Sequence, residues 1–211
     1  MTELDPRSLR VYVITSSTFS GRTHRDVAEA AIRGGATAVQ LRAPELSDRE
    51  LLPVAIDLAG RCAAAGTLFI VNDRPEVAVA SGAGGAHVGQ RDDPASARSR
   101  LGSDLVLGIS VDSIEELDEA VGQGADYVAC TVWATPTKPE AVGGGTDLVA
   151  RIAAASPVPV VGIGGIGASN AADVIAAGAA GIAVISSVAG ADDPVASTRA
   201  LVAAVGTSVE T

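Results

Sequence analysis

The chain of 211 residues suits a single domain that can bury a full core. Hydrophobic residues make up 47% of the sequence and aromatic residues only 2%, so the core must consist of Val, Ile, Leu and Ala, as in parallel strands buried on both faces. The formal net charge of −10 leaves no basic face for a phosphate backbone, which argues against nucleic-acid binding.

Eight short β-rich runs follow one another along the chain, each followed by a segment that is compatible with a helix. This alternation is typical of βα units and not of a β-sandwich. The predicted strands cover residues 11–15, 38–41, 68–71, 86–88, 106–109, 127–130, 158–163 and 181–185.

Two of the intervening segments carry a clear helical pattern. Within residues 48–64, Leu51, Leu58 and further apolar residues recur at helical spacing. Within residues 113–121, Ser113 is followed at the third position by Glu116, which is the signature of a capping box.

Eight alternating units predict a closed TIM (β/α)8 barrel, because eight is its strand count and no linker divides the chain. A doubly wound sheet would carry a G-x-G-x-x-G turn after its first strand, and residues 16–21 do not contain one. We therefore expect one barrel domain over residues 1–211, with loose termini at about 1–9 and 206–211.

The two cysteines, Cys62 and Cys130, form neither a metal-binding spacing nor a disulfide framework, which favours a reducing cytoplasm. The first ten residues lack an apolar signal segment, and Asp173 and several glycines interrupt the most apolar run, residues 171–188. The sequence therefore predicts a soluble cytoplasmic protein without a membrane partner. It leaves the oligomeric state open, a homo-oligomer included.

Chemistry in a barrel sits at the carboxyl ends of the strands, where the βα loops begin. Gly164 and Gly165 follow the seventh predicted strand, and Ser186 follows the eighth. Glycines let backbone amides approach phosphate oxygens, and a serine can donate its hydroxyl. These loops predict a phosphate site, although a tight turn alone would also explain the glycine pair.

Two carboxylates stand at the ends of neighbouring predicted strands, Asp73 after the third and Asp92 after the fourth. Such a pair can share one Mg²⁺, with waters and phosphate oxygens completing the coordination. A helix cap is the alternative for each aspartate, and Asp93, which precedes Pro94, fits a cap better than Asp92 does.

Cationic side chains also stand at strand ends of this acidic chain. Arg42 and Lys138, and with less support Arg74, can meet a pyrophosphate, whereas solvated surface charge is the alternative. The two histidines, His24 and His87, are better explained as hydrogen-bonded structural residues than as catalytic ones.

In this order, the residues at the strand ends resemble the thiamine-phosphate synthase family over nearly the whole chain. None of the motifs that carry the resemblance is specific alone, but together they are. They are Gln-Leu-Arg at 40–42, Val-Asn-Asp-Arg at 71–74, His-Val-Gly-Gln-Arg-Asp at 87–92, Thr-Pro-Thr-Lys at 135–138 and Gly-Ile-Gly-Gly-Ile at 162–166.

The resemblance implies a Mg²⁺-dependent transferase that joins hydroxymethylpyrimidine diphosphate to a thiazole phosphate and releases pyrophosphate. It implies that the pyrimidine diphosphate is held by Gln40, Arg42, Asn72, Ser110 and Lys138, of which Arg42, Ser110 and Lys138 would assist catalysis. It assigns Mg²⁺ to Asp73 and Asp92, and the thiazole phosphate to Thr135, Thr137, Gly145, Ile185 and Ser186, beside the turn at Gly164 and Gly165.

Three positions depart from the family pattern. Pro44 stands where the family carries a lysine, Ser16 stands where an aspartate is frequent, and the segment before Thr135 lacks a Gly-Pro pair and is about one residue shorter. Two alternatives therefore stay open. A thiazole tautomerase would need a histidine on the sixth strand, where this chain has none, and a non-catalytic relative would bind a phosphorylated ligand without turnover.

Overall fold

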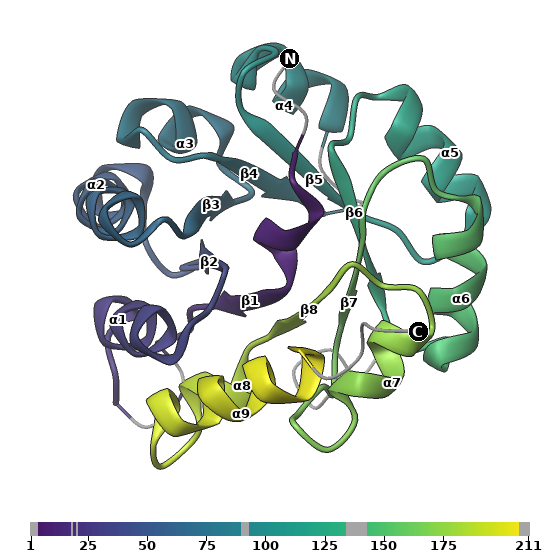
Figure 1. Ribbon diagram of the computed structural model, residues 1–211. Coiled ribbons are helices and arrows are strands. Elements are labelled where there is room, and N and C mark those ends of the chain that lie inside the picture. Colours follow the sequence, from purple (N-terminus) through teal and green to yellow (C-terminus); the bar gives the residue numbers. More distant parts are fainter. Residues whose placement is uncertain (1–3, 18, 20, 90–92, 134–142, 207–211) are drawn as a thin grey trace.

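The computed structural model describes residues 4–17, 19, 21–89, 93–133 and 143–206, which form one closed barrel of eight parallel strands (Figure 1). Each strand pairs with the next along the chain, and β8 pairs with β1. The strands are β1 (Val11–Ile14), β2 (Ala38–Leu41), β3 (Leu68–Asn72), β4 (Gly85–Val88), β5 (Val106–Ser110), β6 (Tyr127–Thr131), β7 (Val160–Ile163) and β8 (Gly181–Val184).

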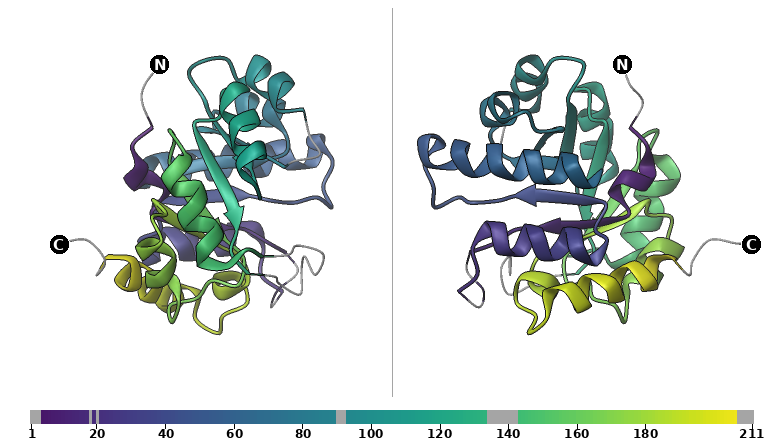
Figure 2. Two further views of the ribbon diagram at one scale, coloured as in Figure 1. Left: turned by 90° about the vertical axis from the view of Figure 1, so that its right-hand side faces the viewer. Right: turned by 60° about the vertical axis from the view of Figure 1, so that its left-hand side comes forward.

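Helices surround the barrel, as Figures 1 and 2 show. They are α1 (His24–Gly34), α2 (Asp48–Ala65), α3 (Pro75–Ser81), α4 (Pro94–Leu101), α5 (Ile114–Gly122), α6 (Gly145–Ala155), α7 (Ala171–Ala176), α8 (Ser186–Ala189) and α9 (Pro194–Gly206), and a 3-10 helix, η1 (Pro6–Leu9), precedes β1. None of the helices in the described ranges has the length and apolar character needed to cross a membrane. The predicted barrel is therefore confirmed in strand number, order and topology.

Polar residues before the helices fix where they begin. Asp93 caps α4 by accepting a hydrogen bond from the Ser96 N–H at 3.0 Å, as the sequence indicates. Ser113 caps α5 in the same way, but the Glu116 carboxylate accepts from the Asp112 N–H at 2.6 Å instead of from the cap residue. Half of the predicted capping box is therefore present at α5.

The amino-terminal segment differs from expectation. Residues 1–9 were expected to be loose, but residues 6–9 form η1, and Leu9 is fully buried. The segment 4–10 lies at the end of the barrel from which the strands start (Figures 1 and 2), and Leu9 belongs to the same buried apolar cluster as Ile70 and Val161. A methyl group at Gly181 would lie 1.8 Å from the Leu9 carbonyl oxygen, so a glycine is needed there. The predicted loose carboxyl terminus was about 206–211; Gly206 ends α9, and residues 207–211 lie outside the described residues.

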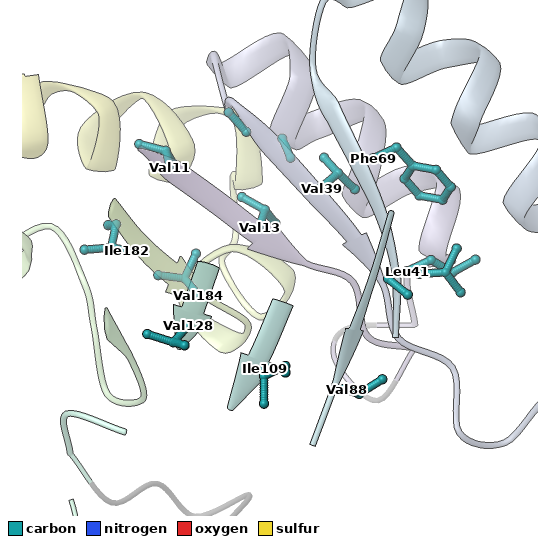
Figure 3. Packing of buried hydrophobic residues seen from close by; sticks show 14 of the residues in the cluster. Val11, Val13, Val39, Leu41, Phe69, Val88, Ile109, Val128, Ile182 and Val184 are labelled. Carbon is teal, nitrogen blue, oxygen red and sulfur yellow. The ribbon is translucent and has the colours of Figure 1, made fainter. Parts of the chain in front are cut away.

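Strand residues alternate between two cores. Val11, Val13, Val39 and Leu41 point toward the surrounding helices and belong to the larger apolar cluster (Figure 3). The residues between them face the barrel interior, where a second, smaller cluster lies. Inward-facing residues at the carboxyl ends of the strands therefore stand over an apolar floor.

Candidate functional site

Predicted site residues meet at the carboxyl end of the barrel. Gln40 pairs in register with Ile14 and with Ile70, and Asn72, two residues beyond Ile70, pairs with His87, so Gln40 and Asn72 both stand near the carboxyl ends of their strands. Ser110 ends β5 and is half-buried. Gln40 is buried and Asn72 is half-buried, as expected for side chains that line the mouth of the barrel.

A chain of hydrogen bonds crosses the barrel interior and joins two of these residues. The Gln40 Nε2 atom donates to the Tyr12 hydroxyl at 2.6 Å, and this hydroxyl lies 3.0 Å from the Tyr127 hydroxyl. The Tyr127 hydroxyl lies 3.0 Å from His87 Nδ1, and His87 Nε2 lies 3.0 Å from Ser110 Oγ. Gln40 on β2 and Ser110 on β5 are therefore linked through three side chains.

The two tyrosines in this chain of hydrogen bonds are held as neutral phenols. Desolvation by burial raises the pKa of both hydroxyl groups well above the ordinary value. The Tyr12 and Tyr127 rings meet edge to face with centroids 6.2 Å apart, and the His87 ring lies 5.6 Å from that of Tyr127. Their positions are thus fixed by packing as well as by hydrogen bonds.

A second polar cluster fastens the loop after β2. His24 Nδ1 lies 2.9 Å from Thr15 Oγ1, and His24 Nε2 lies 3.1 Å from Glu45 Oε1. The Ser17 hydroxyl donates to the same Glu45 oxygen at 2.7 Å. The hydrogen bond from Ser17, followed by those from the backbone and His24, lowers the pKa of Glu45 to about 2. The cluster therefore ties this loop to the end of β1 through an ionised carboxylate.

Arg42 lies beside this cluster, at the start of the same loop. Its backbone N–H donates to Thr15 Oγ1 at 3.3 Å, and its side chain is exposed at the mouth. Arg74 has a different role from the one suggested for it. Its guanidinium donates to the Leu46 carbonyl at 2.7 Å and pairs with Asp48 at 3.2 Å, so it fastens α2 and is not directed at a ligand.

Asp73 has an unusual backbone conformation directly after β3. Its φ of 57° lies in the left-handed region, where non-glycine residues are uncommon and aspartate is among the better tolerated. Its N–H donates to the His87 carbonyl at 2.8 Å, so the end of β3 is held against β4. The carboxylate is exposed. Asp92, its predicted partner, lies outside the described residues, within which no cluster of three metal-ligating side chains occurs.

The loops after β7 and β8 contain the predicted glycine turn. Gly164 and Gly165 have φ values of 100° and 66°, which favour glycine. A methyl group at Gly164 would lie 2.6 Å from the Trp133 carbonyl oxygen. Ser187 donates to the Ile166 carbonyl and so joins the two loops, beside the exposed Ser186. Ile185 immediately precedes α8.

The remaining predicted residues divide between described and undescribed parts of the chain. Gly145 begins α6 with a φ of 66°, and its N–H donates to the Val132 carbonyl at 2.8 Å, so this proton has a partner within the fold. Thr135, Thr137 and Lys138 lie outside the described residues. Cys130 points away from the mouth into the larger apolar core, where burial raises the pKa of its thiol to about 12.

A hollow of about 680 Å³ lies at the opposite end of the barrel, lined by residues that include Leu4, Pro6, Asp126 and Pro159. Asp126 accepts hydrogen bonds there from the Arg98 guanidinium and from the Leu107 N–H. The negative charge of this carboxylate is thus already compensated by Arg98, and the hollow lies far from the carboxyl ends of the strands. We therefore assign the site to the mouth.

Sequence reasoning missed several residues of this site. Tyr12 and Tyr127 lie 115 residues apart in sequence, and Glu45 follows a proline in a loop. A usable signal was the inward position of both tyrosines on predicted strands, since a buried phenol needs a hydrogen-bond partner. Both histidines are hydrogen-bonded at both ring nitrogens, as expected of structural histidines.

Comparison with known proteins is consistent with this geometry. The family described as thiamine monophosphate synthase matches residues 11–188. The thiamine-phosphate synthase of Chloroflexus aurantiacus is 46% identical over 204 residues, which cover 95% of this chain and 94% of the relative. That of Methanoculleus marisnigri is 47% identical, with coverage of 90% and 92%. The solved structure of thiamine phosphate pyrophosphorylase from Pyrococcus furiosus superposes with a TM-score of 0.90 at 34% identity and covers 97% of this chain and 99% of its own.

Proposed function

The chain belongs to the thiamine monophosphate synthase family, and from this premise we propose that it joins hydroxymethylpyrimidine diphosphate to thiazole phosphate and releases pyrophosphate. The observation that carries the proposal is that Gln40, Asn72 and Ser110 stand at the carboxyl ends of their strands in one closed barrel, beside the exposed Asp73. Amide, hydroxyl and carboxylate groups from different strands are what a polar ring and a metal-bound diphosphate require.

The pyrimidine diphosphate is bound by Gln40, Asn72 and Ser110, with Arg42 and Lys138 as its cations. The exposed guanidinium of Arg42 can form two parallel hydrogen bonds to a phosphate. The Glu45 cluster supports this assignment because it anchors the backbone from which Arg42 extends. Arg42, Ser110 and Lys138 stabilise the negative charge that grows on the leaving pyrophosphate.

Asp73 and Asp92 are the residues that would hold Mg²⁺. Carboxylate oxygens are the ligands that this hard cation prefers, and the exposed Asp73 carboxylate at the mouth fits that role. The hydrogen bond from the Asp73 N–H to the His87 carbonyl keeps the ends of β3 and β4, and thus the starts of both aspartate loops, together. When bound, Mg²⁺ supplies positive charge next to the diphosphate.

The thiazole phosphate is bound by the loops after β6, β7 and β8. Gly164 and Gly165 allow the close approach of backbone to phosphate, and Ser186 donates its hydroxyl. Thr135, Thr137 and Ile185 complete this set, whereas Gly145 contributes through its turn because its N–H is already used.

The reaction needs positioning and charge more than acid–base groups. The bond between the pyrimidine methylene carbon and the diphosphate oxygen breaks, and pyrophosphate leaves with the electron pair. The lone pair of the thiazole nitrogen then forms the new carbon–nitrogen bond, and this nitrogen carries no proton to remove. A mouth lined by hydrogen-bond donors, with both cysteines buried in the apolar core, suits this chemistry.

We also propose that the protein works in the cytoplasm, since both cysteines are free thiols, and that its partners are phosphorylated small molecules and not nucleic acids, since a net charge of −10 offers no basic face to a phosphate backbone.

The test is turnover of the purified protein with both substrates, followed as formation of thiamine phosphate and pyrophosphate. We expect product with Mg²⁺, loss of product with a chelator, and at least a hundredfold loss in Asp92→Ala and Asp73→Asn. Asp118→Asn, an exposed change on the outer helix α5, is the matched control. Isomerised thiazole without use of the diphosphate, or binding without turnover, would refute the proposal.

A further inference from the structure

Three residues beneath the mouth have no assigned role in substrate binding: the buried Tyr12 and Tyr127 and the half-buried His87. They connect Gln40 to Ser110 through four hydrogen bonds of 2.6–3.0 Å. Tyr12 and Tyr127 are 1% and 0% exposed, so solvent cannot replace a missing partner. Each buried hydroxyl proton must therefore have an acceptor within the barrel.

The amide of Gln40 gives the connection a direction. Its Nε2 atom is a donor only, so Tyr12 Oη accepts from it and the Tyr12 proton goes to Tyr127 Oη. The Tyr127 proton then goes to His87 Nδ1. In this arrangement each hydroxyl accepts one hydrogen bond and donates one.

The direction continues through the imidazole to the serine. His87 Nδ1 accepts, so the neutral ring carries its proton on Nε2 and donates it to Ser110 Oγ. Ser110 Oγ is therefore an acceptor toward the barrel interior. Its own proton is directed elsewhere, and the half-buried side chain lies at the mouth.

We propose that Tyr12, Tyr127 and His87 are positioning residues whose one-way hydrogen bonds make Ser110 a donor toward the diphosphate substrate. The inference rests on the proposed function for the nature of this ligand, an anion whose oxygens only accept. The opposite direction would give the Ser110 proton to His87 and turn a serine lone pair toward the anion, which is repulsive. We call the hydrogen bonds from Gln40 to Ser110 through these three residues the relay. Its direction determines whether Ser110 presents a proton or a lone pair to the anion, although the three residues themselves do not contact the substrate.

The first test measures the tautomer of His87 in the ligand-free protein by nitrogen-15 NMR of histidine-labelled protein. The chain contains two histidines, so the spectrum is assigned by comparison with His24→Gln. We expect an unprotonated Nδ1 and a protonated Nε2 for His87. The reverse pattern, or a doubly protonated ring at neutral pH, would overturn the proposal.

The second test is a double-mutant cycle on turnover. Tyr127→Phe removes only the hydroxyl, and we expect kcat/KM to fall about tenfold, the effect of one lost hydrogen bond. In the Ser110→Ala background the same change should have almost no effect, because the relay acts through the serine. Equal losses in both backgrounds would show that Tyr127 has a merely structural role. Urea unfolding of each variant identifies any loss that comes from instability.

The two tests separate this inference from the proposed function. If the wild-type protein forms no thiamine phosphate, the proposed function fails, and the tautomer still decides the direction of the relay. If the protein turns over but His87 carries its proton on Nδ1, the proposed function stands and the inference fails.

Discussion

Gly108 lies beneath the mouth of the barrel at a position where no side chain fits. A methyl group there would lie 2.1 Å from Cζ of Tyr127, 2.4 Å from its Cε1 and 2.4 Å from its hydroxyl oxygen. Carbon atoms in contact prefer about 3.5–4.0 Å, so the ring would have to move by more than about 1 Å. The Tyr127 ring is fully buried and packed against Tyr12, which leaves no free space for this movement.

We therefore expect Gly108→Ala to lower the free energy of unfolding by about 3 kcal/mol, at the upper end of the cost of overpacking a core. This is a large part of the 5–15 kcal/mol that holds a typical domain together. We also expect kcat/KM to fall more than tenfold, because the Tyr127 hydroxyl would leave its positions next to Tyr12 and His87. Urea unfolding and the turnover assay measure the two effects.

Gly60→Ala is the matched control, since it makes the same chemical change on the exposed face of α2, where a methyl group meets nothing within 4 Å. It should stabilise the protein by about 0.5–1 kcal/mol, because alanine is the better helix former. In a Tyr127→Leu background Gly108→Ala should cost far less, since leucine lacks the clashing ring atoms. A Gly108→Ala protein within about 0.5 kcal/mol of wild type would refute the reasoning.

Three further predictions concern separate parts of the chain. The pKa of Glu45 is lowered to about 2 from an ordinary 4.5, so the stability that its ionised carboxylate contributes is complete above pH 4.5 and is lost as the pH falls toward 2. In urea unfolding, the difference in stability between wild type and Glu45→Gln should therefore shrink over that pH range. A difference that stays constant would contradict the assignment. Burial raises the pKa of Cys62 and Cys130 to about 12, so neither thiol should react with a disulfide reagent at pH 8 until the protein is unfolded, and rapid labelling of the native protein would refute this. Pro44→Lys should raise kcat/KM severalfold by adding a cation at the mouth, and unchanged turnover would exclude a role for charge at this position.

The fold could be predicted from sequence because the strands are short apolar runs separated by turns, and eight such runs have one usual closed arrangement. The errors are local. Residues 158–163 were expected to form the seventh strand, but β7 begins at Val160, since Pro159 has no N–H for the ladder. The segment before β1 was expected to be loose, yet Leu9 fills the barrel floor, which becomes clear only once the strands enclose a space.

The site could be predicted less completely than the fold, because the residues that orient its ligand-binding groups lie far from those groups along the chain. Motifs such as those at Gln40 and Asp73 identify groups that contact a ligand, because these groups follow strand ends. The residues that orient them carry no such signal. Tyr127 becomes relevant to Gln40 only through Tyr12, and this contact depends on the closure of β6 and β1 around one interior.

The two tyrosines serve the core and the site with different atoms. Their rings belong to the apolar cluster that includes Leu9, Ile70 and Val161, whereas their hydroxyls carry the hydrogen bonds toward Gln40 and Ser110. The two variants should therefore differ in how much stability they lose. Tyr127→Phe keeps the ring but leaves the buried Tyr12 hydroxyl without its acceptor, so it should lose turnover and about 1 kcal/mol of stability, whereas Gly108→Ala displaces the ring and should lose turnover and about 3 kcal/mol. If the two variants lost stability equally, the hydroxyl would be acting as part of the core, and the division between an apolar floor and a polar relay above it would be wrong.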